Sequence, residues 1–108
     1  MDNPWSGVVH LEVDGVERAM SLTLGALAEL ETVLGDDTLV ALVERFESGK
    51  FSSRDVLALI VAGLRGGGWS IQSADLVAAE IKGGPMGAAA AAAQLLARAF
   101  LLPEERRA

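Results

Sequence analysis

The sequence predicts a mainly α fold with a small β part (α+β), in which an N-terminal β-hairpin precedes four or five short helices. Two patterns carry this prediction. Residues 8–22 alternate between apolar and polar side chains, whereas most of the later chain spaces its apolar residues as helices do. Without an internal repeat or a linker, residues 1–108 form one domain, large enough for a single core. We expect residues 1–6 and 104–108 to be flexible ends.

The hairpin prediction depends on the dipeptide Asp14-Gly15, which lies between the two alternating segments. Both central residues of a type I′ turn need positive φ, and this pair is among the strongest signals for such a turn. The predicted apolar face is interrupted at Arg18 and otherwise carries Val9, Leu11, Val13, Val16, Met20 and Leu22.

The register of the hairpin depends on the length of its turn. A two-residue turn places Val13 opposite Val16, and it also places Glu12 opposite Glu17. Like charges in directly opposed positions are mildly unfavourable. A longer turn would relieve this repulsion, so both registers stay open.

Two amphipathic helices are expected next. Thr23 can cap the first, and Gly35 can end it. The acidic pair Asp36-Asp37 precedes the second helix, where capping and the helix dipole favour negative charge, and Gly49 closes it. The apolar stripe of the first helix is Leu24, Leu27, Leu30 and Leu34, and that of the second is Leu39, Leu42, Val43 and Phe46.

A third helix is the expected centre of the core. Ser52 can cap it, and Asp55, three residues later, makes a near relative of the capping box. Its body, residues 56–64, is apolar almost all round, as in a helix that is buried on several sides. Gly66, Gly67 and Gly68 are expected to end it and to form a flexible connector.

Two further helices are predicted near the C-terminus. Ser73 can cap a short one over residues 74–82, which Gly83-Gly84 would end. Pro85 suits the first turn of the last helix, which contains an alanine tract over residues 88–93 and extends to Pro103. The small alanine face permits close approach of another helix, either within the chain or from a second copy in a homo-oligomer.

The composition excludes several classes of function. The net charge is −6, from 15 acidic and 9 basic residues, so a phosphate backbone would be repelled and nucleic-acid binding is not expected. The N-terminus lacks the basic and apolar regions of a signal peptide, and the longest uncharged run, between Lys82 and Arg98, is too short to cross a membrane. The absence of cysteine fits a reducing compartment. We therefore expect a soluble cytoplasmic protein.

The sequence offers no catalytic, cofactor-binding or metal-binding motif. The lone histidine, His10, lies on a predicted strand without an oriented partner, as a surface histidine would. The glycines Gly66, Gly67 and Gly68 follow a helix and lack the lysine of a phosphate-binding loop. The protein is therefore predicted not to be an enzyme and to need no cofactor.

A protein-binding site is the remaining prediction. Trp69 follows the glycine connector, where it could be either a core side chain or a contact residue, since tryptophan is favoured at interface hot spots. Phe46 has the same two interpretations. The candidate partner-binding residues are Phe46, Arg65, Gly66, Gly67, Gly68 and Trp69.

Three segments together resemble one family. They are residues 22–31 (LTLGALAELE), residues 42–55 (LVERFESGKFSSRD) and residues 62–68 (AGLRGGG). In this order they are similar to small gene transfer agent proteins, which are grouped with the tail assembly chaperones of long-tailed phages. The similarity covers about residues 7 to 102.

The resemblance implies a role in tail assembly and no catalytic residues. Such chaperones bind the tape-measure protein, keep its apolar helices soluble and help to recruit tail-tube subunits. The first alternative is a structural tail or tail-tube component that stays in the particle, and the second is a small adaptor or regulatory domain. Tube subunits usually resemble β-sandwich or barrel proteins, whereas this sequence predicts one hairpin followed by helices.

Overall fold

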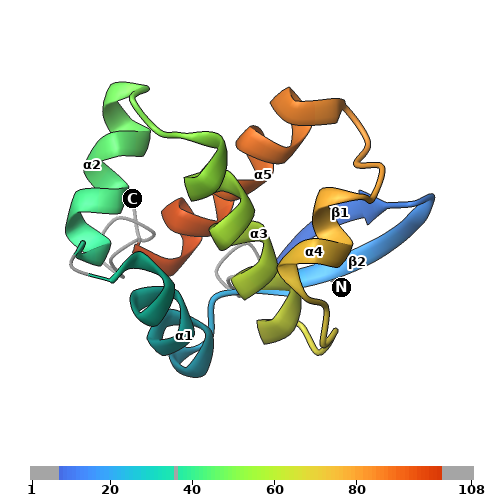
Figure 1. Cartoon of the computed structure of the whole chain (residues 1–108), viewed down its shortest axis with the longest axis horizontal. Coiled ribbons are helices and arrows are strands. Elements are labelled where there is room, and N and C mark those ends of the chain that lie inside the picture. Colours follow the sequence, from blue (N-terminus) through green and yellow to red (C-terminus); the bar gives the residue numbers. More distant parts are fainter. Residues whose placement is uncertain (1–7, 36, 101–108) are drawn as a thin grey trace, which may run out of the picture.

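The computed structural model describes residues 8–35 and 37–100 and shows a β-hairpin beside a group of helices (Figure 1). The predicted α+β class is confirmed, whereas the expected flexible ends lie outside the described residues. Strands β1 (Val8–Val13) and β2 (Val16–Ser21) pair antiparallel. The helices in the described part are α1 (Leu24–Leu34), α2 (Leu39–Ser48), α3 (Ser53–Gly66), α4 (Ser73–Val77) and α5 (Gly84–Phe100).

The hairpin has the two-residue turn and the register that goes with it. Asp14 and Gly15 have φ values of 52° and 80°, as a type I′ turn requires. Glu12 is paired with Glu17 in spite of their like charges. Such a pair costs less than about 1 kcal/mol. Moving one buried aliphatic side chain to the solvent face would cost about 1.5–3 kcal/mol, and a one-residue slip would move a whole face. The buried face therefore decides the register; it contains Val9, Leu11, Val13 and Met20.

Helix α1 is capped as predicted, and its predicted apolar stripe is buried only in part. The Thr23 side chain accepts a hydrogen bond from the Ala26 backbone at 3.1 Å, and Gly35 ends the helix with φ 68°. The predicted stripe is wrong at Leu24, which is 84% exposed. The predicted Leu30 is buried, and Leu34 packs against the core. Ala26, outside the predicted stripe, is buried as well, because α1 packs closely against α3 and a small side chain fits the contact.

Helix α2 is capped by Thr38, which was not among the predicted caps. The Thr38 side chain accepts from the Ala41 backbone at 3.0 Å, so the prediction that the acidic pair caps this helix is wrong. Asp37 instead binds Arg45, and Asp36 lies outside the described residues. The predicted apolar face is confirmed: Leu42 is fully buried, while Leu39, Val43 and Phe46 pack against the core.

Helix α3 is the central element, as predicted, and it packs against the hairpin, α1, α4 and α5. Its start is a full capping box, because the Asp55 backbone donates to Ser52 Oγ and the Ser52 backbone donates to the Asp55 carboxylate. The side chains of Leu59, Ile60 and Leu64 are fully buried. The helix continues through Gly66, so the first glycine of the predicted connector is helical.

Helix α4 is shorter than the predicted segment 74–82. It spans Ser73–Val77, and the predicted cap Ser73 is its first residue, preceded by Gln72. The following chain turns to the hairpin instead of continuing the helix. The Glu80 carbonyl accepts from the Asp14 backbone at 2.7 Å, and Ile81 forms a β-bridge with Val13. Pairing with the open edge of β1 places Ile81 against the core.

Helix α5 turns its small side chains toward the rest of the chain. It begins at Gly84, which was predicted to precede it, and Pro85 occupies its first turn as predicted. It packs against α3 and β1. The alanine-rich face is thus used within the chain, where the buried residues are Ala88, Ala91, Ala92, Leu95 and Leu96. The predicted extension to Pro103 lies outside the described residues.

Candidate protein-binding site

The described residues hold no cluster that suggests chemistry. His10 is exposed on the hairpin opposite Ala19. Among residues 8–35 and 37–100, no three histidine, aspartate or glutamate side chains gather closely enough to hold a metal ion.

The predicted glycine connector is a packing contact rather than a flexible hinge. A Cβ atom on Gly66 would overlap the Ser21 carbonyl oxygen, and one on Gly67 would overlap the Ala19 carbonyl oxygen. Glycine therefore lets the C-terminal end of α3 lie directly on the backbone of β2. Only Gly68, with φ 105° and open space around it, has the freedom that the prediction gave to all three glycines.

The side chains on either side of these glycines are also fixed. Arg65 forms an ion pair with Glu29 at 3.0 Å and donates to the Ile71 carbonyl at 3.2 Å. Trp69 is half-buried and packs against the core. The Arg18 guanidinium carbon lies 3.9 Å from the centre of the Trp69 ring. Part of the Trp69 ring is therefore packed inward and part is accessible.

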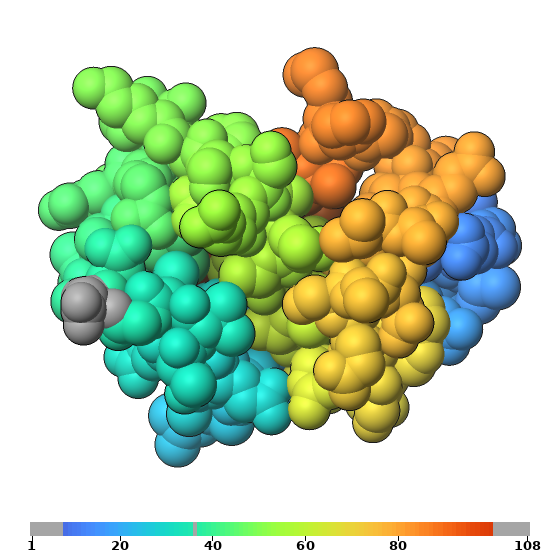
Figure 2. Space-filling view, viewed as in Figure 1, coloured from blue at the N-terminus to red at the C-terminus, as the bar shows by residue number. Residues whose placement is uncertain are grey.

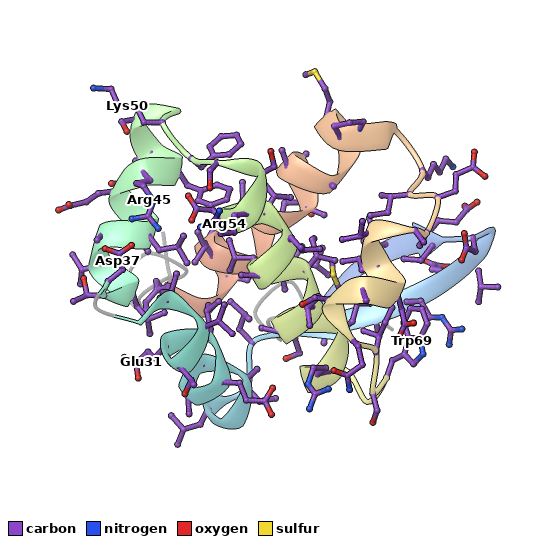
Figure 3. All side chains as sticks on the ribbon, in the orientation of Figure 1. Glu31, Asp37, Arg45, Lys50, Arg54 and Trp69 are labelled. Carbon is purple, nitrogen blue, oxygen red and sulfur yellow. The ribbon has the colours of Figure 1, made fainter. Side chains whose placement is uncertain are left out.

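Phe46 lies at the other end of α3. Its ring stacks on Phe51, with centroids 4.5 Å apart and an interplanar angle of 7°. Phe51 precedes the start of α3 and Trp69 follows its end, which separates the two by the length of the helix, roughly 20 Å at 1.5 Å per residue. In Figure 3, Trp69 and Arg45 of α2 lie on opposite sides of the molecule. The six predicted residues thus belong to two separate places.

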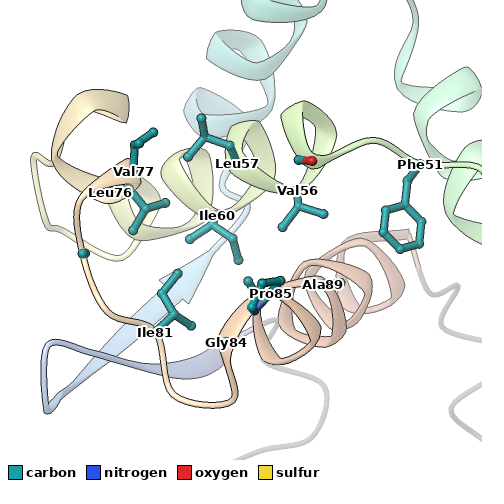
Figure 4. Close-up of a pocket in the computed structure, with 13 residues that line it drawn as sticks. Phe51, Val56, Leu57, Ile60, Leu76, Val77, Ile81, Gly84, Pro85 and Ala89 are labelled. Atoms are coloured by element: carbon teal, nitrogen blue, oxygen red, sulfur yellow. The ribbon is translucent and has the colours of Figure 1, made fainter.

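An apolar groove lies between α3 and α5 and has a volume of about 580 Å³. Figure 4 shows its length, from Phe51 at one end to Val77 and Ile81 at the other. On the molecular surface, a notch separates the start of α3 from the first turn of α5 (Figure 2). The lining is Phe51, Ser53, Val56, Leu57, Ile60, Leu76, Val77, Ala79, Ile81, Gly84, Pro85, Ala88 and Ala89.

Large apolar side chains are exposed in this groove and in the chain next to its lining. Val77 lines it and is 70% exposed; Met86, which follows the lining residue Pro85, is 81% exposed. Neighbouring exposed apolar side chains around an apolar hollow are typical of protein contacts, and methionine adapts to different partners. The groove is therefore suited to the apolar face of another protein segment.

An ion pair fixes the end of the groove at Phe51. Arg45 of α2 donates two hydrogen bonds to Asp55 of α3, both at 2.9 Å, and approaches Asp37 at 3.4 Å. The Arg45 guanidinium lowers the pKa of the Asp55 carboxyl, although burial opposes this effect. The hydrogen bond to Asp55 in turn raises the pKa of Arg45. The ion pair thus joins α2, which precedes Phe51 in the sequence, to α3, which follows it.

The segments that resemble tail proteins belong to a recognised family. A family model described as phage tail tube protein, GTA-gp10, matches residues 6–101. The chain belongs to this family. The GTA-gp10 family supports a structural role in a phage-type tail, which was the first alternative to the assembly role that the resemblance implied. Searches of curated proteins and of solved structures gave no match. Within the described part of this GTA-gp10 family protein, no helix is long and apolar enough to cross a membrane.

Two features of the surface were missed from the sequence. Residues 56–64 read as core, although Val56 and Leu57 also line the groove. Arg18 was noted only as an interruption of an apolar face. A cation at a core-facing strand position needs a partner, and this need is the signal in the sequence. Trp69 is an aromatic residue that could meet it.

Proposed function

We propose that this GTA-gp10 family protein is a non-catalytic tail assembly chaperone of the bacterial cytoplasm. In this proposal, the groove between α3 and α5 binds an amphipathic helix of the tape-measure protein, and the complex helps to recruit tail-tube subunits. The observation that carries the proposal is the apolar groove of about 580 Å³, in which Val77 is 70% exposed.

The chemistry of the groove suits a helical client. An amphipathic helix presents apolar side chains at positions i, i+3, i+4 and i+7, and such helices commonly bind in apolar grooves. The net charge of −6 supports the solubility of a complex with an apolar client. The two-stranded sheet of the described residues also favours an assembly role, because a β-barrel tube wall needs more strands.

Co-expression with the tape-measure protein tests the proposal. Val77→Glu places a charge in the groove at an exposed position, so it should abolish soluble co-purification while the protein stays folded. Val40→Glu is the matched control, because Val40 is 67% exposed on α2 and does not line the groove. Equal co-purification of both variants would reject the groove as the client site.

A second candidate is a structural tail component that remains in the particle, with tail-tube subunits or further copies of the chain as partners. The family description, phage tail tube protein, favours it. Mass spectrometry of purified particles separates the candidates. A chaperone should be absent or scarce in mature particles, whereas a tail component should be present in a fixed ratio to the other tail proteins.

A further inference from the structure

Arg18 occupies an unusual place for a cation. It lies on β2 opposite Leu11, on the face that carries the fully buried Met20. Its guanidinium is stacked on the Trp69 ring, 3.9 Å from the ring centre, which is close enough for a cation–π interaction. Stacking occupies one face of the guanidinium and leaves the N–H groups at its edge free to bind.

No carboxylate within the described chain neutralises Arg18. Arg45, Arg65 and Lys82 all form ion pairs, whereas Arg18 forms none with residues 8–35 or 37–100. Its Nε is buried without a hydrogen-bond partner. The terminal nitrogens also lack a partner in the described part, but they are not buried. The guanidinium thus presents unused donors to solvent on a protein whose net charge is −6.

The surroundings hold this guanidinium in place. The Trp69 backbone donates to the Leu64 carbonyl at 3.0 Å and accepts from the Ile71 backbone at 2.8 Å. The packing of Gly66 and Gly67 on β2 fixes the approach of this segment to the strand. A donor that is already fixed loses little conformational entropy on binding.

An aliphatic side chain completes the surface. Val16, two residues before Arg18 on the same face of β2, is 50% exposed. We call Val16, Arg18 and Trp69 the Arg18–Trp69 surface. Arginine and tryptophan are enriched at interface hot spots.

We propose that the Arg18–Trp69 surface binds a carboxylate side chain of a protein partner, an aspartate or glutamate next to an aliphatic residue that contacts Val16. The charge decides the occupant, because a planar guanidinium cation without an ion-pair partner among the described residues matches a carboxylate. The nearest acidic residue on the strand, Glu17, points to the opposite face and is paired with Glu12. This site is separate from the groove and does not depend on the proposed function.

The test is an NMR titration of the full chain with two capped peptides, acetyl-Leu-Glu-Leu-amide and acetyl-Leu-Gln-Leu-amide. The signals to follow are the Trp69 indole N–H and the Arg18 Nε–H. We expect saturable shifts of both signals with the glutamate peptide and binding at least about 10-fold weaker with the glutamine peptide, since a charge-assisted hydrogen bond is worth about 1.4 kcal/mol or more. Absence of saturation, or equal shifts with both peptides, would overturn the proposal.

Variants locate the binding. Arg18→Gln should abolish the shift of the Trp69 indole signal, whereas Arg54→Gln should leave it unchanged. Arg54 is exposed and, like Arg18, forms no ion pair in the described part, but it lies far from Trp69 (Figure 3). Arg18→Lys keeps the charge but lacks the planar fork, so binding should fall several-fold. Unchanged binding in Arg18→Lys and Arg18→Gln would reject the site. The comparison of the two peptides on the unaltered protein needs no variant to fold.

Discussion

The two ends of α3 are held by different kinds of contact. At the N-terminal end, side-chain charges join α3 to α2 through Arg45 and Asp55, and an apolar groove stays open beside them. At the C-terminal end, backbone lies on backbone, because Gly66 and Gly67 have no side chain to separate α3 from β2. Close packing leaves little room for a ligand, whereas long charged side chains bridge elements that stay apart. The comparison explains why the hollow lies at the first end and a fixed aromatic surface at the second.

The largest expected effect is at the packed end. Gly66→Ala should lower the free energy of unfolding by about 3 kcal/mol, because the new Cβ would overlap a backbone carbonyl that cannot move aside. Gly25→Ala is the matched control in α1, where a Cβ meets only Thr23 Oγ1 at 3.9 Å. Alanine there should stabilise the helix by about 0.5–1 kcal/mol. Urea denaturation measures both; a loss below about 1 kcal/mol in Gly66→Ala would contradict the close contact.

A smaller effect is expected at Trp69, beyond the same end of α3. Trp69→Ala should lower the free energy of unfolding by about 2 kcal/mol, less than the 3–5 kcal/mol typical of a fully buried tryptophan, because the side chain is only partly buried. The protein should remain folded at 25 °C. Thermal denaturation followed by circular dichroism checks this. A protein that no longer folds would make Trp69 a pure core residue, and an unchanged Tm would make it a pure contact residue.

The features that could be predicted from the sequence are those determined by neighbouring residues. The turn at Asp14-Gly15 and the capping box of Ser52 and Asp55 depend on atoms a few residues apart. Alternation and helical spacing gave the hairpin and the central place of α3, because each element has to bury its apolar face.

The features that were missed depend on contacts between distant segments. Residues 79–82 leave the helical path because Ile81 pairs with Val13, more than 60 residues earlier in the chain. Leu24 is exposed because α1 packs on α3 through the face that contains Ala26. The run of glycines suggested a flexible backbone. Only the position of β2 shows that Gly66 and Gly67 are needed for close packing. The groove, likewise, requires α3, α4 and α5 to be placed together.

The smallest expected effect is at the charged end of α3, and it depends on pH. Asp55→Asn should cost about 1–2 kcal/mol near pH 7, since Arg45 stays partly exposed and can be hydrated. The folded protein lowers the pKa of Asp55, so the ion pair contributes fully above the ordinary aspartate pKa, about 3.9, and its contribution is lost as pH falls through the lower, folded value. The unaltered protein should therefore lose its advantage over Asp55→Asn as the pH falls below the ordinary aspartate pKa. Urea denaturation of both proteins at pH 7 and pH 2 measures this. A stability difference that stays constant across the two pH values would show that shape and hydrogen bonding, rather than charge, join α2 to α3.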